Sequence, residues 1–366
     1  PYAVERDRLE EYPRELLRHL GQAGFLRYPF PKEWGGEGGS FLGFITIAEE
    51  LARCDASTSV IMLLNPTLVA APILAGGSED LKKRVLPGLF SGELLGCFCL
   101  TEPEAGSDAA SLKTTASLVG DEFVIEGEKI FIQQGDVADI ALVVCKVRMG
   151  NSKPRTSVLL AEGLKGRKGI ERRRLKGKMG IRAATTGYIR FNGFRVPRKN
   201  LIGELGGGFG IVLETLNGGR LGIGAQAVGI AQGAFDRAFK RARERVQFGK
   251  PLIELGAIEG RVAEMATAIE AARSLLYRAA MAKDAGQDYR MLACMAKLFA
   301  SEVANRVSYD AVQICGGFGY IGELSDVERF YRDARITEIY EGTSEIQRLL
   351  ITRYLKESCG YRNGIH

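Results

Sequence analysis

Two short segments combine acidic, hydroxyl and glycine residues at spacings that could form a binding or catalytic site. The first, LTEPEAGSD (100–108), leaves an apolar strand and turns through Pro103 and Gly106. Such a bend can aim successive backbone N–H groups and the Thr101 and Ser107 hydroxyls at one place, where they could hold an anion or a polar ring edge. A plain loop of turn-forming residues has the same composition.

The second segment, RITEIYEGTSEIQR (335–348), contains an acidic residue in an unusual local setting. Ser344 and Gln347 have the spacing of a capping box, which predicts that a helix begins at Ser344. Glu341 then lies just before the helix N-terminus, and Gly342 lets the backbone adopt unusual dihedral angles. Spacing alone favours a carboxylate that merely lies near a helix dipole, and a catalytic carboxylate is the functional alternative.

The residue inventory restricts the chemistry that is available. The chain has 366 residues but only two histidines, His19 and His366. A Ser-His-Asp triad, a Cys-His pair or a His-rich metal site therefore has almost no material. The seven cysteines are odd in number and scattered, and we expect reduced, mostly buried thiols in a cytosol-like compartment. If the protein is an enzyme, carboxylates or a bound cofactor must carry the chemistry.

The overall composition is that of a soluble globular protein with two or three domains, since 46% of the residues are hydrophobic and 26% are charged. We count no apolar run that reaches the roughly 18 residues needed to span a bilayer, and the N-terminal residues are strongly charged. We therefore expect neither a membrane anchor nor an export signal.

The net charge of +6 has its densest source in residues 165–178, where eight residues are basic. A solvated hairpin edge is the simpler interpretation, because lysine and arginine deter pairing between exposed strands. Attraction of an anionic ligand or of nucleic acid is the alternative. The run lacks interleaved aromatic residues for base stacking, which disfavours nucleic acid.

Three compositional zones must position these segments. Residues 1–94 are expected to be helical, with apolar residues at helical spacing in 9–26 and 44–57 and a serine-capped helix in 78–93. Residues 95–206 show the alternating, β-branched pattern of an antiparallel β domain. Five strand segments carry this pattern: LLGCFCL, EFVIEGEKIFI, ADIALVVCKV, TSVLLAE and GYIRFNGFRV.

Residues 207–366 return to long helices, two of them expected at about 256–284 and 288–313, with EIQRLLITRYLKE closing the chain. The glycine-rich segment GELGGGFG (203–210) does not follow an apolar strand within a βαβ unit, so it is not a dinucleotide-binding fingerprint. The fold class is therefore α+β and multidomain, in the order helix, sheet, helix.

Taken together, several segments resemble the acyl-CoA dehydrogenase family, most closely its short-chain (butyryl-CoA) members. They occur in the family's order between about Pro13 and Glu357. The matching pieces are CFCLTEPEAGSD, GEKIFI, KMGIRAATT, GRLGIGAQAVGIAQGAFDRA, ERVQFGKPL, QICGGFGY and YRDARITEIYEGTSEIQR.

The resemblance implies an N-terminal α-helical domain, a middle antiparallel β-barrel-like domain and a C-terminal four-helix-bundle domain. It implies a homotetramer built as a dimer of dimers. It also implies non-covalent FAD, held partly by a neighbouring subunit, and electron-transfer flavoprotein as the electron acceptor.

The resemblance also implies a mechanism. Glu341 in YEGT would remove the α-proton of an acyl-CoA while the β-hydrogen leaves as hydride to flavin N5, which gives a trans-2-enoyl-CoA. We expect burial beside an apolar acyl chain to raise the pKa of this carboxyl toward working pH.

Two comparisons within the family restrict the subgroup. Relatives that carry the base elsewhere have it where this chain has Gly219, before Arg220. There is no arginine near Ser59 to bind the distal carboxylate of glutaryl-CoA. Neither a histidine nor a metal is required.

The family's binding residues can be matched one by one. Those matched to cofactor contacts are Phe98, Leu100, Thr101, Gly106, Ser107, Phe131, Ile132, Gln133, Arg245, Phe248, Gln313, Ile314, Gly316, Gly317, Thr343, Ser344 and Glu345. Those matched to substrate contacts are Ser107, Asn217, Arg220 and Gly342. Arg332 and Asp333 are expected to form an ion pair that supports the loop carrying Glu341.

The chain departs from the family pattern at three places. The usual Trp-Ile-Thr beside the flavin is Phe131, Ile132 and Gln133, an aspartate near the substrate is Asn217, and a flavin-contacting glutamine is Gly256. These departures concern the flavin potential, the acceptor and the substrate rather than the fold.

Other functions stay open beside the leading one. They are an oxygen-using acyl-CoA oxidase, a flavoprotein associated with DNA, and a non-catalytic acyl-CoA-binding relative. Butyryl, hexanoyl and methyl-branched substrates all fit the sequence. The expected compartment is the cytoplasm, or the mitochondrial matrix in a eukaryote.

Overall fold

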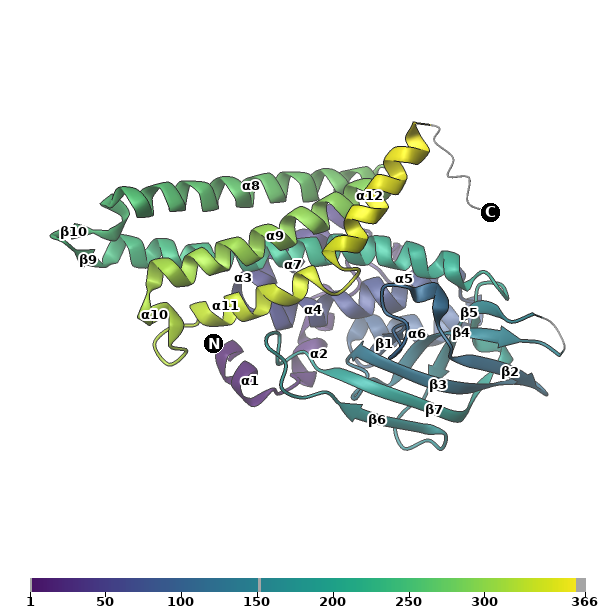
Figure 1. Ribbon diagram of the computed structural model, residues 1–366. Coiled ribbons are helices and arrows are strands. Elements are labelled where there is room, and N and C mark those ends of the chain that lie inside the picture. Colours follow the sequence, from purple (N-terminus) through teal and green to yellow (C-terminus); the bar gives the residue numbers. More distant parts are fainter. Residues whose placement is uncertain (1, 151–152, 360–366) are drawn as a thin grey trace.

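The computed structural model describes residues 2–150 and 153–359. It contains a bundle of long helices and a β-sheet region that lies against one end of the bundle (Figure 1). The N-terminal helices fill the space behind and between these two parts.

The N-terminal helices are separated by caps and prolines that the sequence makes visible. Ser78 accepts a hydrogen bond from the Leu81 N–H, as predicted for the serine-capped helix. The single helix expected over 9–26 is wrong: the chain breaks before Pro13, because the residue before a proline avoids helical angles. The elements are α1 (Ala3–Leu9), α2 (Arg14–Gln22), η1 (Lys32–Trp34), α3 (Phe41–Cys54), α4 (Ala56–Leu64), the π-helix η2 (Asn65–Ala70), α5 (Ala71–Gly76) and α6 (Glu79–Ser91).

One segment corrects the expectation about membrane spans. Ala56–Gly76, which comprises α4, η2 and α5, is long and apolar enough to cross a bilayer by length and composition. Serines, threonines and prolines interrupt its apolar residues, so the sequence shows no continuous apolar run of that length here. The segment nevertheless contains no charged residue. Because 72% of its most apolar window is buried inside the protein, it packs as a core helix does.

The middle region forms a mixed sheet rather than a purely antiparallel one. Its strand order is β6-β7-β3-β2-β4-β5-β8. Both β1 and β2 pair with one strand, β4, and both pairings are parallel. Alternation identifies the buried face of a strand but not the direction of its neighbour, so this was not predictable. The strands are β1 (Gly96–Cys99), β2 (Thr115–Val119), β3 (Glu122–Gln133), β4 (Ile140–Arg148), β5 (Arg155–Glu162), β6 (Ile170–Arg174), β7 (Thr186–Pro197) and β8 (Leu201–Ile202).

The basic run 165–178 includes β6, which lies at one end of the strand order, as predicted for a hairpin edge. Its arginines are not simply solvated, however. Arg172 donates to the Ala138 carbonyl at 2.7 Å, and Arg174 donates to Asp136 at 2.8 Å. These bonds tie the edge strand to the turn that follows β3.

The C-terminal helices are built around α7, and they confirm the long helices expected there. Close contacts at two of its glycines bring α3 against it: a Cβ at Gly229 would lie 2.2 Å from the Glu49 carbonyl, and one at Gly233 would lie 2.3 Å from the Arg53 carbonyl. The elements are α7 (Gly208–Glu244), β9 (Val246–Gln247), β10 (Lys250–Pro251), η5 (Leu252–Glu254), α8 (Gly256–Asp284), α9 (Arg290–Cys315), α10 (Gly317–Tyr320), α11 (Val327–Ala334), η6 (Arg335–Glu338) and α12 (Ser344–Ser358).

Candidate active site

The segment between η6 and α12 presents Glu341 in a strained conformation. Glu341 has φ 53° and Gly342 has φ 89°, and left-handed angles are unfavourable for a glutamate. The helix begins at Ser344 as predicted, but the predicted cap is wrong. Thr343 is the capping residue and accepts from the Ile346 N–H at 3.4 Å, because the chain is already helical at Ser344.

The carboxyl of Glu341 lies over a glycine of α7. A Cβ at Gly219 would be only 2.7 Å from Glu341 Oε2, so a larger residue could not share this space. The Oε2 atom is inaccessible to solvent and has no hydrogen-bond partner among the described residues. Burial raises the pKa of Glu341 from 4.5 to about 7, and the positive charges of Arg220 and Lys297 counteract part of this rise. The carboxyl can therefore exchange a proton near neutral pH.

The peptide that follows Glu341 is held by two buried donors. Gln347 Nε2 donates to the Glu341 carbonyl at 3.1 Å and to the Gly342 carbonyl at 2.8 Å. Lys297 Nζ donates to the same Gly342 carbonyl at 2.8 Å. The Glu341 N–H, by contrast, has no acceptor within residues 2–150 and 153–359. Glu341 thus has a backbone donor without an acceptor and a carboxyl oxygen without a donor; the free N–H is the group that could stabilise a negatively charged oxygen.

The raised pKa of Glu341 predicts a cost in stability at alkaline pH. The folded protein keeps a proton that the unfolded chain loses above pH 4.5, so this contribution to stability is present below pH 4.5 and is lost as pH rises through about 7. The shift corresponds to up to about 3 kcal/mol; we expect about 2 kcal/mol, because Oε2 is inaccessible but the residue as a whole is only half-buried. We expect Glu341→Gln to be more stable than the natural protein by about this amount at pH 8 and equally stable at pH 4.5.

Urea unfolding of both proteins at the two pH values measures this difference. A stability difference that is the same at pH 4.5 and pH 8 would contradict the assigned titration.

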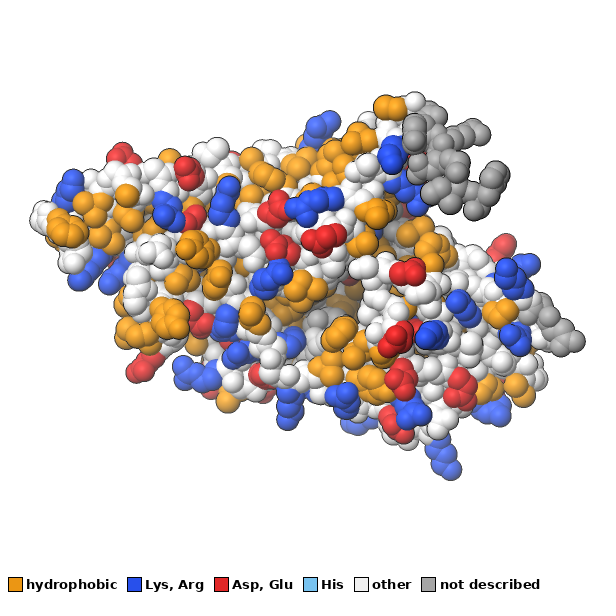
Figure 2. Space-filling view, in the orientation of Figure 1, with side chains coloured by type: hydrophobic (Ala, Val, Ile, Leu, Met, Phe, Trp, Pro, Cys, Tyr) orange, Lys and Arg blue, Asp and Glu red, His pale blue; other side chains and the backbone are white. Residues whose placement is uncertain are grey.

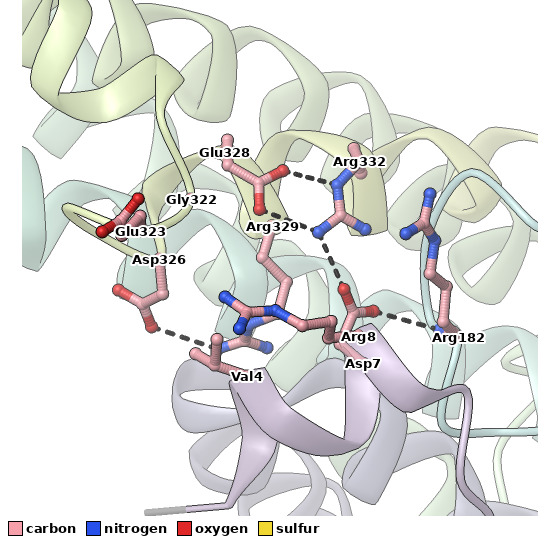
Figure 3. A pocket seen from close by; sticks show the side chains of 10 residues that line it. All are labelled: Val4, Asp7, Arg8, Arg182, Gly322, Glu323, Asp326, Glu328, Arg329 and Arg332. Atoms are coloured by element: carbon pink, nitrogen blue, oxygen red, sulfur yellow. Dashed lines mark hydrogen bonds and ion pairs between the residues drawn. The ribbon is translucent and has the colours of Figure 1, made fainter.

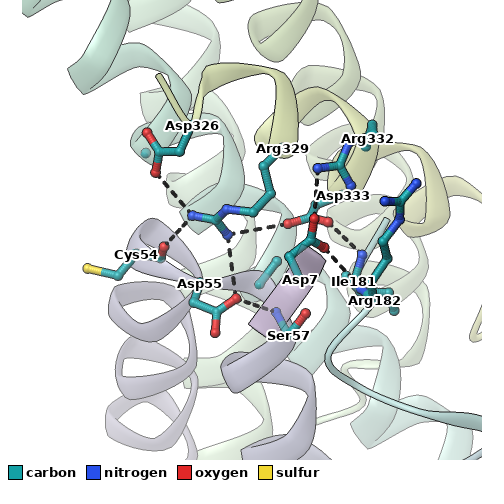
Figure 4. A network of polar contacts seen from close by, with 12 residues as sticks. Asp7, Cys54, Asp55, Ser57, Ile181, Arg182, Asp326, Arg329, Arg332 and Asp333 are labelled. Carbon is teal, nitrogen blue, oxygen red and sulfur yellow. Dashed lines mark hydrogen bonds and ion pairs between the residues drawn. The ribbon is translucent and has the colours of Figure 1, made fainter. Parts of the chain in front are cut away.

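Helix α11, which leads into the Glu341 segment, is anchored by a buried ionic network (Figure 4). Arg329 is only 2% exposed; it donates to Asp326 at 3.2 Å and lies 3.4 Å from Asp55 and 3.5 Å from Asp333. Asp333 also accepts the Ile181 N–H at 2.5 Å, and burial raises its pKa to about 7. The network joins α11 to the start of α4 and to the loop after β6.

The predicted ion pair between Arg332 and Asp333 is wrong. Consecutive helical residues point in different directions, so Arg332 instead binds Glu328 at 2.5 Å and Asp7 of α1 at 2.8 Å. Its third contact is the Met179 carbonyl at 3.0 Å. The predicted supporting role thus has different partners.

A cavity of about 200 Å³ opens beside this network, between α1 and α11 (Figure 3). Acidic and basic side chains line it in equal number, and Asp7 and Arg332 form an ion pair in its wall. Its balanced lining favours neither an anion nor a cation.

The loop 100–114 leaves the sheet between β1 and β2 and is braced by a buried ion pair. Lys129 Nζ donates to the Leu100 carbonyl at 2.9 Å and to Glu102 at 2.8 Å, and Glu102 accepts the N–H groups of Lys113 and Thr114. The N–H of Glu102 bonds within the loop, so the predicted cradle of N–H groups is only partly available. The Thr101 side chain is half-buried and that of Ser107 is exposed.

The end of β3 exposes one predicted site residue and buries another. The pairing of β3 with β7 shifts register between Lys129 and Ile132, and Phe131 adopts φ 57° with 68% of its surface exposed. Bulges of this kind re-aim side chains beside functional sites. The buried Gln133 Nε2 has no partner in the described part of the chain.

A chain of contacts connects these two regions. Gly219 lies under Glu341, and Gly222, one turn further along α7, packs against a side chain of α4. The π-helix η2 continues α4, and its Asn65 side chain accepts the Gly96 N–H at the start of β1. In the view of Figure 2 the surface has a recess between the helices and the sheet, and hydrophobic side chains surround this recess.

A second group of predicted site residues lies far from Glu341 in the same chain. Gly219 and Arg245 are 26 residues apart along α7, which corresponds to about 39 Å. Phe248 is 92% exposed. The structure of one chain therefore does not bring this group to Glu341: Arg245, Phe248, Gln313, Ile314, Gly316 and Gly317.

Two residues that contact the Glu341 segment were missed or misread in the sequence. Lys297 is fully buried in α9, and its only signal is a lone cation in the apolar, alanine-rich stretch ACMAKLFA. Gln347 was read as part of a capping box, but its amide turns back to the carbonyls of residues 341 and 342.

Models of three domains of one family match the chain in order. They are the N-terminal domain of acyl-CoA dehydrogenase over residues 1–93, the middle domain over 97–194 and the C-terminal domain over 206–356.

Individual relatives agree with these matches. A short-chain specific acyl-CoA dehydrogenase of Clostridium acetobutylicum is 44% identical, over 96% of this chain and 92% of that protein. The structure of butyryl-CoA dehydrogenase from Megasphaera elsdenii has a TM-score of 0.92 and 40% identity, over 97% of this chain and 93% of that one. A glutaryl-CoA dehydrogenase of Mycobacterium smegmatis in complex with FADH2 has a TM-score of 0.92 and 25% identity, over 99% and 91%.

Proposed function

The chain belongs to the acyl-CoA dehydrogenase family, and we propose that it dehydrogenates a short-chain acyl-CoA, straight or methyl-branched, to the trans-2-enoyl-CoA. It is an oxidoreductase that acts on CH–CH groups. The observation that supports this reaction best is the Glu341 carboxyl, whose Oε2 is buried without a partner over Gly219.

FAD is the cofactor, and the residues present fit it. Gln133 Nε2 and Ser344 Oγ are buried polar atoms left without partners by the described residues, so a ligand with polar ring edges or phosphates would satisfy them. Ser344 also lies at the N-terminus of α12, where anions are favoured. When bound, FAD supplies an acceptor for hydride at N5. We propose that the matched residues from Phe98 to Gln133, with Thr343, Ser344 and Glu345, hold it in this chain.

The protein's own residues carry the proton transfer. The Glu341 carboxylate accepts the α-proton, the electrons of the broken C–H bond form the α,β double bond, and the β-hydrogen departs with its electron pair. Negative charge develops on the thioester oxygen, and the free Glu341 N–H donates to it. Because Gln347 holds the carbonyls of residues 341 and 342, this N–H needs little reorganisation during the reaction.

The remaining contacts belong to the CoA ester and to partner proteins. We propose Ser107, Asn217, Arg220 and Gly342 for the substrate. Asn217 accepts a hydrogen bond from Arg220, which fixes both side chains on α7. We further propose a homotetramer, a dimer of dimers, with electron-transfer flavoprotein as the acceptor. The domain boundaries 1–94, 95–206 and 207–366 and the cytoplasmic location stay predictions.

An anaerobic titration of the purified protein with C4, C6, C8 and isobutyryl-CoA tests the function. We expect the flavin absorbance near ~450 nm to bleach, fastest with one of the short thioesters, which then identifies the substrate class. A yellow protein that none of them bleaches would contradict the proposal. The non-catalytic and DNA-associated flavoproteins of the superfamily would then be the better interpretations. Gln133, which stands where the family has threonine, would be the first residue to replace.

Arg245 provides a test of the proposed contact across subunits. Arg245 is exposed at the end of α7, far from Glu341, and we propose that it binds the FAD pyrophosphate of a neighbouring subunit. We expect Arg245→Ala to weaken FAD retention about tenfold or more, because a charge-assisted hydrogen bond is lost. The flavin-to-protein absorbance ratio after dialysis measures this loss. Lys240→Ala, which removes an exposed cation of the same helix, is the control; equal flavin content in the two variants would remove the role.

A further inference from the structure

Lys297 is a buried cation that the proposed chemistry does not use. It lies on α9, its side chain is fully buried, and its Nζ donates to the Gly342 carbonyl at 2.8 Å. Burying an ammonium group is costly unless the charge is compensated. No carboxylate of the described chain forms an ion pair with Lys297, so its hydrogen-bond partner is the backbone of the Glu341 segment.

The Gly342 carbonyl receives two donors from two different helices. Lys297 reaches it from α9 and Gln347 from α12, so both lone pairs of the oxygen are used. The peptide between residues 342 and 343 therefore cannot rotate without breaking a bond to each helix. This fixes the backbone next to Glu341 in spite of its left-handed φ.

Lys297 also acts on the Glu341 carboxylate through its charge. Its positive charge lowers the pKa of Glu341, and the negative charge of Glu341 in turn counteracts the burial that lowers the pKa of Lys297 to about 8. Five other titratable groups interact electrostatically with one or both members of the pair: Arg220 of α7, Cys294 of α9, Glu338 of η6, Tyr340, and Glu345 of α12. Of these, Arg220 is the one further cation, and it lowers the pKa of Glu341 more than Lys297 does; Lys297 supplies the second positive charge at the base.

We propose that Lys297 is a positioning residue for α-proton abstraction, which fixes the peptide after Glu341 and by its charge favours the ionised form of the Glu341 carboxyl. The inference rests on the proposed function, since it assigns a role toward the base of that reaction. Lys297 touches neither the substrate nor the cofactor in this account. It acts on Glu341 alone.

The test separates proton removal from hydride transfer. A 3-thia-acyl-CoA carries sulfur at the β position, so it can lose its α-proton but has no β-hydrogen to release as hydride. Its enolate beside oxidised flavin gives a long-wavelength absorption band, and the pH midpoint of that band reports the proton equilibrium with Glu341. We expect Lys297→Met to raise this midpoint by about one pH unit or more. Turnover of butyryl-CoA should fall about tenfold or more in kcat, with KM within about twofold.

Two further variants at the same position separate charge from hydrogen bonding. Lys297→Arg keeps the charge and should return the midpoint most of the way to that of the natural enzyme. Lys297→Gln keeps a donor but not the charge, and its midpoint should resemble that of Lys297→Met. If Lys297→Met does not retain FAD, the comparison of the Arg and Gln variants decides the same question. Equal midpoints in those two variants would overturn the inference.

Asn305→Ala is the matched control. Asn305 is an uncharged residue of the same helix that donates to the Ala334 carbonyl at 3.0 Å. Its loss should lower the thermal midpoint without moving the pH midpoint. If Lys297→Met behaves in the same way, its role is structural only. A natural enzyme that gives no band and no bleaching would instead refute the proposed function itself.

Discussion

Glu341→Gln is expected to bind FAD and acyl-CoA normally but to reduce flavin with butyryl-CoA about 10⁴-fold more slowly, which is the upper range for loss of a general base. Glutamine has the same shape, so it fits over Gly219, but its amide cannot accept the α-proton. Stopped-flow measurement of flavin bleaching without oxygen gives the rate constant directly. The variant should still perturb the flavin spectrum when crotonyl-CoA binds, because binding does not require the base.

Glu357→Gln, at the exposed far end of α12, the helix that follows Glu341, is the control for loss of a negative charge. It should leave the rate unchanged. If Glu341→Gln kept more than about a tenth of the natural rate, the base assignment would be wrong.

Gly219→Ala is expected to lower kcat about 100-fold although it changes no reacting group. The added Cβ would lie 2.7 Å from Glu341 Oε2 and 3.0 Å from its carboxyl carbon, so the carboxylate must move. Misplacement of a catalytic group by about 1 Å can cost this much in rate. The same measurement of anaerobic flavin bleaching applies.

The neighbouring glycine provides a close control. A Cβ at Gly218 would meet no described atom within 4 Å. Both substitutions favour the helix to the same extent, by about 0.5–1 kcal/mol, so helix propensity cannot explain a difference between them. Gly218→Ala should keep its rate within about twofold. Equal rates in the two variants would show that the carboxylate does not depend on the space over Gly219.

The sequence was informative where local pattern decides structure. The long helices of the C-terminal zone, the serine cap at Ser78 and five strands follow from period and capping residues, and the structure has them. Glu341 stood out because a glycine and a helix start adjoin it, while its proposed role came from the family resemblance. Its burial and raised pKa agree with the expectation for a base in an apolar site.

Other features depend on contacts between distant segments, which no local pattern carries. Lys297 lies 45 residues from the carbonyl that it binds, and nothing near it in the sequence refers to that carbonyl. The parallel pairing of β1 and β2 with β4 depends on how the loop 100–114 re-enters the sheet. Arg332 and Asp333 are adjacent and opposite in charge, yet helix geometry sends them to Asp7 and Arg329 instead.

The close contact of α3 with the glycines of α7 has a consequence for how the chain folds. The two helices are separated by more than 150 residues, and the whole sheet lies between them in the sequence. The β region is thus an insertion between two halves of one helical core, and the contacts that complete this core have a large sequence separation. Such contacts slow folding, because the loop between them must close first. During synthesis, α3 remains without its main packing surface until α7 has left the ribosome.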